Sequence, residues 1–111
     1  MNKSPSAFPS QQAADPRKTL AAHYYLDPSV MEWERNTLFD QSWQFVCHVS
    51  DVAQSGDFYA FSLHGQDYFL VRDKSDTLRG FANVCPHRGH RLLDGQGNRA
   101  TITCPYHAWT F

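Results

Sequence analysis

From residue 43 onward, the hydrophobic residues are gathered into short runs that turn residues separate. These runs are rich in aromatic and β-branched side chains, which favour strands. The predicted strands are residues 43–49, 57–63, 67–72, 78–84 and 100–104. Between them, His64-Gly65 predicts a tight hairpin, residues 73–76 a polar turn and residues 94–98 a Gly-rich turn. The pattern favours a small antiparallel all-β domain.

A different pattern precedes the strands. Asp27-Pro28-Ser29 predicts the start of a helix over residues 28–41, because Asp can cap a helix and Pro suits its first turn. Its apolar face would consist of Val30, Met31, Trp33, Thr37 and Leu38. Residues 1–23 are rich in Ser, Pro, Gln and Ala and predict a flexible tail. The expected parts are therefore a tail (1–23), a helical segment (24–42) and a β domain (43–111).

Composition narrows the classes of function. A chain of 111 residues with 41% hydrophobic residues has room for one small packed domain. The formal net charge is −1 and no basic cluster is present, which argues against nucleic acid or an anionic membrane as the main partner. No apolar run approaches the roughly 20 residues that span a bilayer, and no signal-peptide core follows Met1.

The chain has three cysteines, and two of them belong to a pair of related motifs. Cys85-Pro86-His87 has the spacing C-x-H, and Cys104-Pro105-Tyr106-His107 has the spacing C-x-x-H. Sixteen residues separate the motifs, which is enough for a turn and a returning strand to bring them together. The third cysteine, Cys47, is expected in a strand of the core, and the reducing cytoplasm is the expected compartment.

Thiolates and imidazoles suit zinc, copper and iron–sulfur centres, so ligand type alone leaves the metal open. A structural zinc site usually pairs Cys with Cys and His with His, whereas each loop here holds one of each. The mixed arrangement fits a [2Fe–2S] cluster in which two His replace two Cys on one iron. A zinc site in the same pocket is the alternative.

The two stretches C-P-H-R-G-H and C-P-Y-H-A-W-T-F resemble the cluster loops of the Rieske non-haem iron oxygenases, the ring-hydroxylating dioxygenase α-subunit family. The resemblance covers roughly residues 24–111. It implies a Rieske-type β-sandwich, cut short at its C-terminal end, that holds a [2Fe–2S] cluster. The implied ligands are Cys85, His87, Cys104 and His107.

Five other loop residues are expected to surround the cluster without binding it. Gly89 would permit a close backbone approach. Tyr106 and Trp109 would cover the cluster or donate a hydrogen bond to it. Arg88 would pair with a carboxylate outside this chain or lie in solvent, and His90 lies outside the ligand spacing.

The resemblance also has implications beyond these loops. Respiratory Rieske proteins carry an extra Cys in each loop and link the two by a disulfide, whereas His90 and Tyr106 stand in those neighbourhoods here. This favours an oxygenase, with a free-standing Rieske ferredoxin as the alternative. An oxygenase implies a mononuclear non-haem Fe(II) in a further domain, so no catalytic residue is expected in this chain.

Partners and substrate follow from the same resemblance. A ferredoxin or a flavin/iron–sulfur reductase would supply electrons. The full protein would be a homo-oligomer, a trimer, in which electrons pass to a neighbouring subunit. The stretch from Tyr24 through the second loop resembles family members that act on quaternary ammonium compounds, and an aromatic ring stays open as the alternative substrate.

Overall fold

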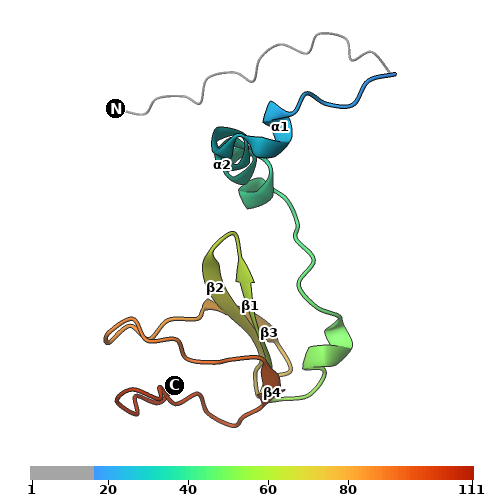
Figure 1. The fold of residues 1–111 in the computed structure, drawn as a ribbon. Helices are drawn as coiled ribbons and strands as arrows, with labels where there is room; N and C mark the ends of the chain where they lie inside the picture. The colour runs from blue at the N-terminus through green and yellow to red at the C-terminus, as the bar shows by residue number, and fades with distance from the viewer. Residues whose placement is uncertain (1–16) are drawn as a thin grey trace. The chain divides into compact units, whose positions relative to one another are not determined.

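The computed structural model describes residues 17–111, and the chain divides into two compact units between Gln44 and Phe45. Figure 1 shows their helices and strands. The first unit contains α1 (His23–Leu26), α2 (Pro28–Thr37) and a 3-10 turn, η1 (Phe39–Gln41). The second contains a 3-10 turn, η2 (Val49–Val52), and the strands β1 (Asp57–Leu63), β2 (Gln66–Arg72), β3 (Leu78–Ala82) and β4 (Gln96–Asn98).

The predicted helix begins where the sequence indicates. The Asp27 side chain accepts a hydrogen bond from the Ser29 backbone N–H at 2.9 Å, and Pro28 opens the first turn. The α-helix ends at Thr37, and the last predicted residues form η1 instead. Of the predicted tail, residues 1–16 lie outside the described residues, and His23 begins α1. No helix within residues 17–111 has the length and apolar character needed to cross a membrane.

The second unit is built on one antiparallel sheet with the strand order β3-β2-β1-β4. β1 and β2 are joined by the predicted two-residue hairpin loop. Both of its residues have positive φ, 51° at His64 and 82° at Gly65, as the hairpin turn that fits the twist of the strands requires. The small antiparallel β domain with a preceding helix is therefore confirmed.

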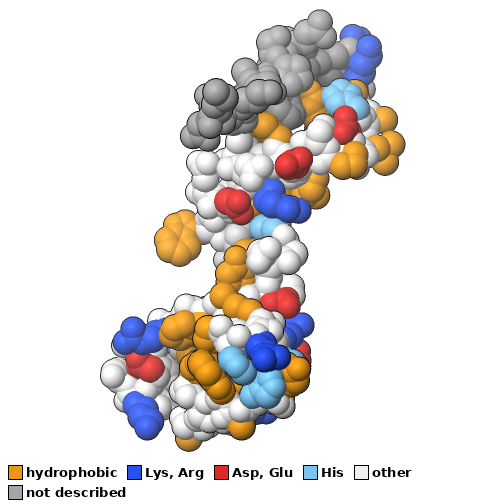
Figure 2. Space-filling model, turned by 90° about the vertical axis from the view of Figure 1, so that its left-hand side faces the viewer, with side chains coloured by type: hydrophobic (Ala, Val, Ile, Leu, Met, Phe, Trp, Pro, Cys, Tyr) orange, Lys and Arg blue, Asp and Glu red, His pale blue; other side chains and the backbone are white. Residues whose placement is uncertain are grey.

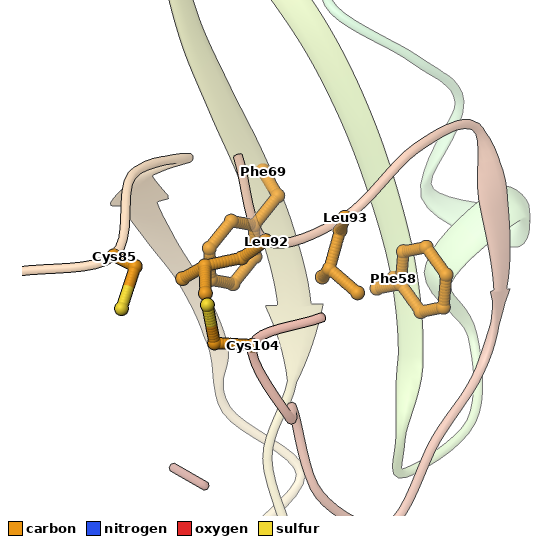
Figure 3. Close-up of a cluster of buried hydrophobic side chains, with 6 residues drawn as sticks. All are labelled: Phe58, Phe69, Cys85, Leu92, Leu93 and Cys104. Atoms are coloured by element: carbon orange, nitrogen blue, oxygen red, sulfur yellow. The ribbon is translucent and has the colours of Figure 1, made fainter. Parts of the chain in front are cut away.

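One face of the sheet carries the core. Phe58 pairs with Val71 and Ala60 with Phe69, so all four side chains lie on the same face. Phe58 and Phe69 are buried there against side chains from the loops, as Figure 3 shows. The loop residues of this core are Cys85, Leu92, Leu93 and Cys104. Loops, rather than a second sheet, thus form the layer that covers the described strands.

The Gly-rich stretch at 94–98 is only partly a turn, which corrects the prediction. Its last three residues form β4 and pair with β1. Gly97 lies opposite Phe58, and a Cβ atom on Gly97 would lie 3.2 Å from the ring atom Cε1 of Phe58. The glycine here makes room for a core aromatic ring.

The strand predicted over 43–49 is wrong. Trp43 and Phe45 are highly exposed, and within residues 17–111 no strand pairs with this segment. Strand propensity depends on a neighbouring strand and a surface to pack on, and both are lacking. His48 and Asp51 instead cap η2 reciprocally. Cys47 is half-buried outside the core and outside any strand, and its burial, followed by the nearby Asp51 charge, raises the pKa of its thiol.

The strand predicted over 100–104 is also wrong, because only a short paired segment forms. Ile102 and Phe111 exchange two backbone hydrogen bonds of 3.1 and 2.8 Å, and Thr103 bridges Thr110. These contacts close the base of the loop that carries the second Cys/His motif.

Candidate metal centre

Two six-residue loops at one end of the second unit carry the two motifs. The first loop, residues 85–90, is closed by a hydrogen bond of 2.7 Å from the Cys85 N–H to the His90 carbonyl. The Gly89 N–H also donates to the Cys85 carbonyl at 2.8 Å. Gly89 has a φ of 70°, which turns the chain back at the fifth residue.

The second loop, residues 104–109, repeats this backbone. The Cys104 N–H donates to the Trp109 carbonyl at 2.7 Å, and the Ala108 N–H donates to the Cys104 carbonyl at 2.9 Å. Ala108 has a φ of 57° and occupies the position that Gly89 occupies in the first loop. The two motifs therefore stand on one backbone frame, used twice.

Aromatic contacts hold the two loops together. The His87 and His107 rings meet edge to face with centroids 4.9 Å apart. The Trp109 indole lies nearly parallel to the His87 ring, at 4.7 Å and 8°. Further along, Tyr106 contacts His107 at 3.8 Å and His90 at 5.7 Å. Side chains from both loops thus form one continuous row of rings.

The two thiols, unlike these rings, are buried. Cys85 and Cys104 are each only 2% exposed and belong to the core cluster (Figure 3). Burial opposes ionisation of Cys104, but hydrogen bonds from the Tyr106 and His107 backbone N–H groups favour the thiolate. A hydrogen bond with the Cys85 thiol acts in the same direction, and together these bonds lower the pKa of Cys104 below its ordinary value of 9.0. The site therefore favours a thiolate ligand.

The imidazole pair lies at the surface, in contrast to the thiol pair. His87 and His107 are both exposed, and Figure 2 shows histidine side chains next to one another on the surface of the second unit. Within residues 17–111, no three His, Cys, Asp or Glu side chains converge as ligands of a single metal ion. A pair of buried thiols and a separate pair of exposed imidazoles match the ligands of a two-iron cluster.

The structure refines the expectations for the surrounding residues. Gly89 has a positive φ of 70°, and no protein atom lies within 4 Å of a Cβ atom placed on it, so its close approach to the cluster stays a prediction. The rings of His90 and Tyr106 face each other at 5.7 Å, in the neighbourhoods where the respiratory proteins have their disulfide. Arg88 is exposed. Trp109 stacks on His87, and its expected role as a cover of the cluster stays a prediction.

One residue that holds the first loop in place is not predicted by the sequence pattern. Asn83 is 2% exposed, and its side-chain oxygen accepts hydrogen bonds from the backbone N–H groups of Leu92 and Leu93 at 3.0 and 2.9 Å. Its amide nitrogen donates to the Leu93 carbonyl at 2.7 Å. The available signal was a polar residue inside an apolar run directly before Cys-Pro.

Relatives of known activity show similarity across this chain. The carnitine monooxygenase oxygenase subunit of Escherichia coli K12 is 42% identical over 99% of this chain, which corresponds to 30% of the relative. The toluate 1,2-dioxygenase α subunit of Pseudomonas putida is 35% identical over 78% of this chain and 19% of its own length. The chain thus spans less than a third of the relatives that it matches.

A solved structure and a family model agree with these matches. The structure of a quaternary ammonium Rieske monooxygenase, studied for carnitine oxidation and inter-subunit electron transfer, superposes with a TM-score of 0.77. It is 46% identical and covers 80% of this chain and 25% of its own. The family model of the Rieske [2Fe–2S] domain matches residues 42–111, both loops included. The chain therefore belongs to the Rieske [2Fe–2S] domain family.

Proposed function

We propose that Cys85, His87, Cys104 and His107 hold a [2Fe–2S] cluster and that this chain is the electron-transfer domain of a Rieske-type oxygenase. The observation that supports the ligand set best is the duplicated loop frame, which places both thiols together and both imidazoles together. Bound there, the cluster supplies a one-electron redox couple, and its two neutral imidazole ligands favour acceptance of an electron compared with four thiolates.

The proposed ligands and Arg88 have different roles in this site. The two thiolates hold the buried side of the cluster, and backbone N–H groups beside Cys104 stabilise charge on sulfur. His87 and His107 hold the exposed side, so their ring edges are what a redox partner can contact. Arg88, exposed between His87 and Gly89, offers a positive charge to an acidic partner surface.

Single substitutions test the ligand set. We expect Cys104→Ala and His87→Ala to abolish the visible and EPR spectra of a Rieske centre, because each removes one of four ligands. Cys47→Ala and His90→Ala are matched controls, since each removes the same side-chain type outside the proposed set, and both should retain the spectra. Retained spectra in Cys104→Ala or His87→Ala, or zinc in place of iron on metal analysis, would contradict the ligand set.

An electron-transfer domain of this kind implies a role for the whole protein. We infer that it is an oxygenase whose mononuclear non-haem Fe(II) lies in a further domain, and that a ferredoxin or reductase supplies its electrons. Inter-subunit electron transfer in the structurally similar monooxygenase supports a homo-oligomer, for which a trimer is the expected state. The cytoplasmic location expected from the sequence stays a prediction.

The substrate class that we propose is a quaternary ammonium compound. Relatives named for carnitine are 42–46% identical to this chain, whereas relatives named for aromatic substrates are 31–35% identical. The test is oxygen consumption by the full-length protein with a reductase, comparing L-carnitine and γ-butyrobetaine with toluate. Consumption that depends on toluate and not on either quaternary compound would contradict the substrate class while leaving the ligand set intact.

A further inference from the structure

The Trp109 side chain is aimed by the backbone of the second loop. Its carbonyl accepts the hydrogen bond from the Cys104 N–H at 2.7 Å, and Ala108 before it has a φ of 57°. A left-handed residue other than glycine is unfavourable by about 1–2 kcal/mol, so this turn is maintained by the rest of the loop. The turn directs the indole across to the first loop.

There the indole covers one face of the His87 ring. The two rings are 4.7 Å apart and 8° from parallel, and the His107 ring meets His87 at 69° from another side. Within residues 17–111, no hydrogen bond to a His87 ring nitrogen is present. In most metal sites a hydrogen bond to the second ring nitrogen orients a histidine ligand. Within this chain, the flat contact with Trp109 and the edge contact with His107 restrain the plane of the His87 ring.

We propose that Trp109 is a positioning residue for His87: its indole fixes the plane of the imidazole and keeps water from one face of it, and thereby sets the magnetic and redox properties of the loaded site. This inference rests on the proposed function, because it needs His87 to be a ligand. It goes beyond a covering role, since it requires a flat ring and not merely an apolar side chain.

The charge of the cluster determines the direction in which loss of the indole changes the midpoint potential. A cluster of two ferric ions, two sulfides and two thiolates is neutral, and its one-electron reduced form carries one negative charge. Water at the face of His87 stabilises the charged form more than the neutral one. Because solvent exposure is among the factors that set the potentials of iron–sulfur centres, loss of the indole should raise the midpoint potential.

The experiment uses the cluster-loaded protein with Trp109→Phe, Trp109→Leu and Trp109→Met. Phe keeps a flat ring that can cover the imidazole face, whereas Leu and Met are apolar but cannot shield the whole face from water. Phe111→Leu is the matched control, because Phe111 is 52% exposed against 48% for Trp109 and lies two residues away. The readouts are the ¹⁴N couplings of the two ligand histidines by pulsed EPR of the reduced protein, and the midpoint potential by redox titration.

We expect Trp109→Leu and Trp109→Met to change the couplings of one histidine and to raise the potential, while Trp109→Phe and Phe111→Leu leave both close to wild type. If Leu and Met variants fail to load the cluster while the Phe variant loads fully, the need for a flat ring is shown by loading itself. Wild-type couplings in Trp109→Leu, or loss of the cluster in all three variants, would overturn the proposal.

The same spectra separate this inference from the proposed function. A wild-type protein without two histidine nitrogen couplings would contradict the ligand set and remove the basis of the inference. A wild-type protein with both couplings, unchanged in Trp109→Leu, would contradict the role of Trp109 alone.

Discussion

The two loops share one backbone and differ in how they are supported. In each loop the first residue is a cysteine, its N–H bonds to the carbonyl of the sixth residue, and the fifth residue is left-handed. The histidine stands third in the first loop and fourth in the second. The unequal spacings C-x-H and C-x-x-H are therefore two placements on one frame, and not two different loop structures.

The supports lie in different environments. Asn83 holds the first loop from inside the protein, through three hydrogen bonds to Leu92 and Leu93. The second loop is held at its base by the exposed hydroxyl pair of Thr103 and Thr110, 3.1 Å apart, and by the Ile102–Phe111 backbone pair. A buried polar group is costly when it loses its partners, whereas an exposed one bonds to water instead. Substitutions in the support of the first loop should thus destabilise the protein more than substitutions in the support of the second loop.

The largest expected difference follows from these supports. We expect Asn83→Ala to lower the free energy of unfolding by about 3 kcal/mol, because it leaves the two buried N–H groups of Leu92 and Leu93 unpaired. Thr110→Val, which removes the exposed hydroxyl contact, should cost less than about 1 kcal/mol. Chemical denaturation measures both values.

Asn36→Ala is the control for the Asn83 change, because Asn36 is exposed on α2. It should alter the free energy of unfolding by no more than about 0.5 kcal/mol. Equal losses in Asn83→Ala and Thr110→Val would show that the two loops are supported alike and that the comparison is wrong.

A smaller effect tests the shared frame through its left-handed position. Gly89→Ala should destabilise the protein by about 1 kcal/mol from backbone strain, since no protein atom would crowd the added Cβ. Ala108→Gly relieves the corresponding strain and should stabilise by up to about 1 kcal/mol. Shifts of opposite sign in thermal unfolding are therefore expected from reciprocal changes.

Ala53→Gly controls for the general cost of glycine, because Ala53 is exposed with a φ of −78°. That variant should be destabilised by roughly 0.5 kcal/mol. If Ala108→Gly behaved like Ala53→Gly, the left-handed turn of the second loop would carry no strain, and the two loops would differ in backbone after all.

The smallest expected effect is the lowered pKa of the Cys104 thiol, which titration of reduced, cluster-free protein measures. Although burial raises its pKa, the hydrogen bonds from Tyr106, His107 and Cys85 bring it below 9.0. A thiol whose pKa is lower in the folded protein than in the unfolded one stabilises the folded state at pH values above the unfolded pKa. This stabilisation is lost as the pH falls through the folded pKa. Thiolate absorbance in the ultraviolet should therefore show a step below pH 9 that Cys104→Ser removes. Loss of that step in Cys47→Ser instead would contradict the assignment.

Much of this architecture could be predicted from residues alone. Asp27-Pro28 marks the start of α2 because capping is a local interaction, and His64-Gly65 marks the hairpin because its turn needs two residues of positive φ. The two Cys/His motifs could be paired because their ligand types and spacing suit only a few metal centres. These features depend on neighbours in the sequence.

The features that were not predicted correctly depend instead on residues that are distant in the sequence. Residues 43–49 have strand composition but no strand to pair with, and residues 96–98 have turn composition but lie beside β1, where Gly97 accommodates the Phe58 ring. Asn83 could be noticed but not interpreted, because its partners are nine and ten residues away. Each depends on a contact that composition does not encode.

The sequence by itself therefore determined the helix cap, the hairpin turn and the kind of domain, since short-range geometry and side-chain chemistry fix them, and it predicted the donor set. Only the tertiary structure decided that both loops use one frame, that Asn83 supports the first, and that Trp109 lies flat against His87. The physical reason is that these contacts join residues from different loops and strands, which folding brings together once the core under the sheet is packed.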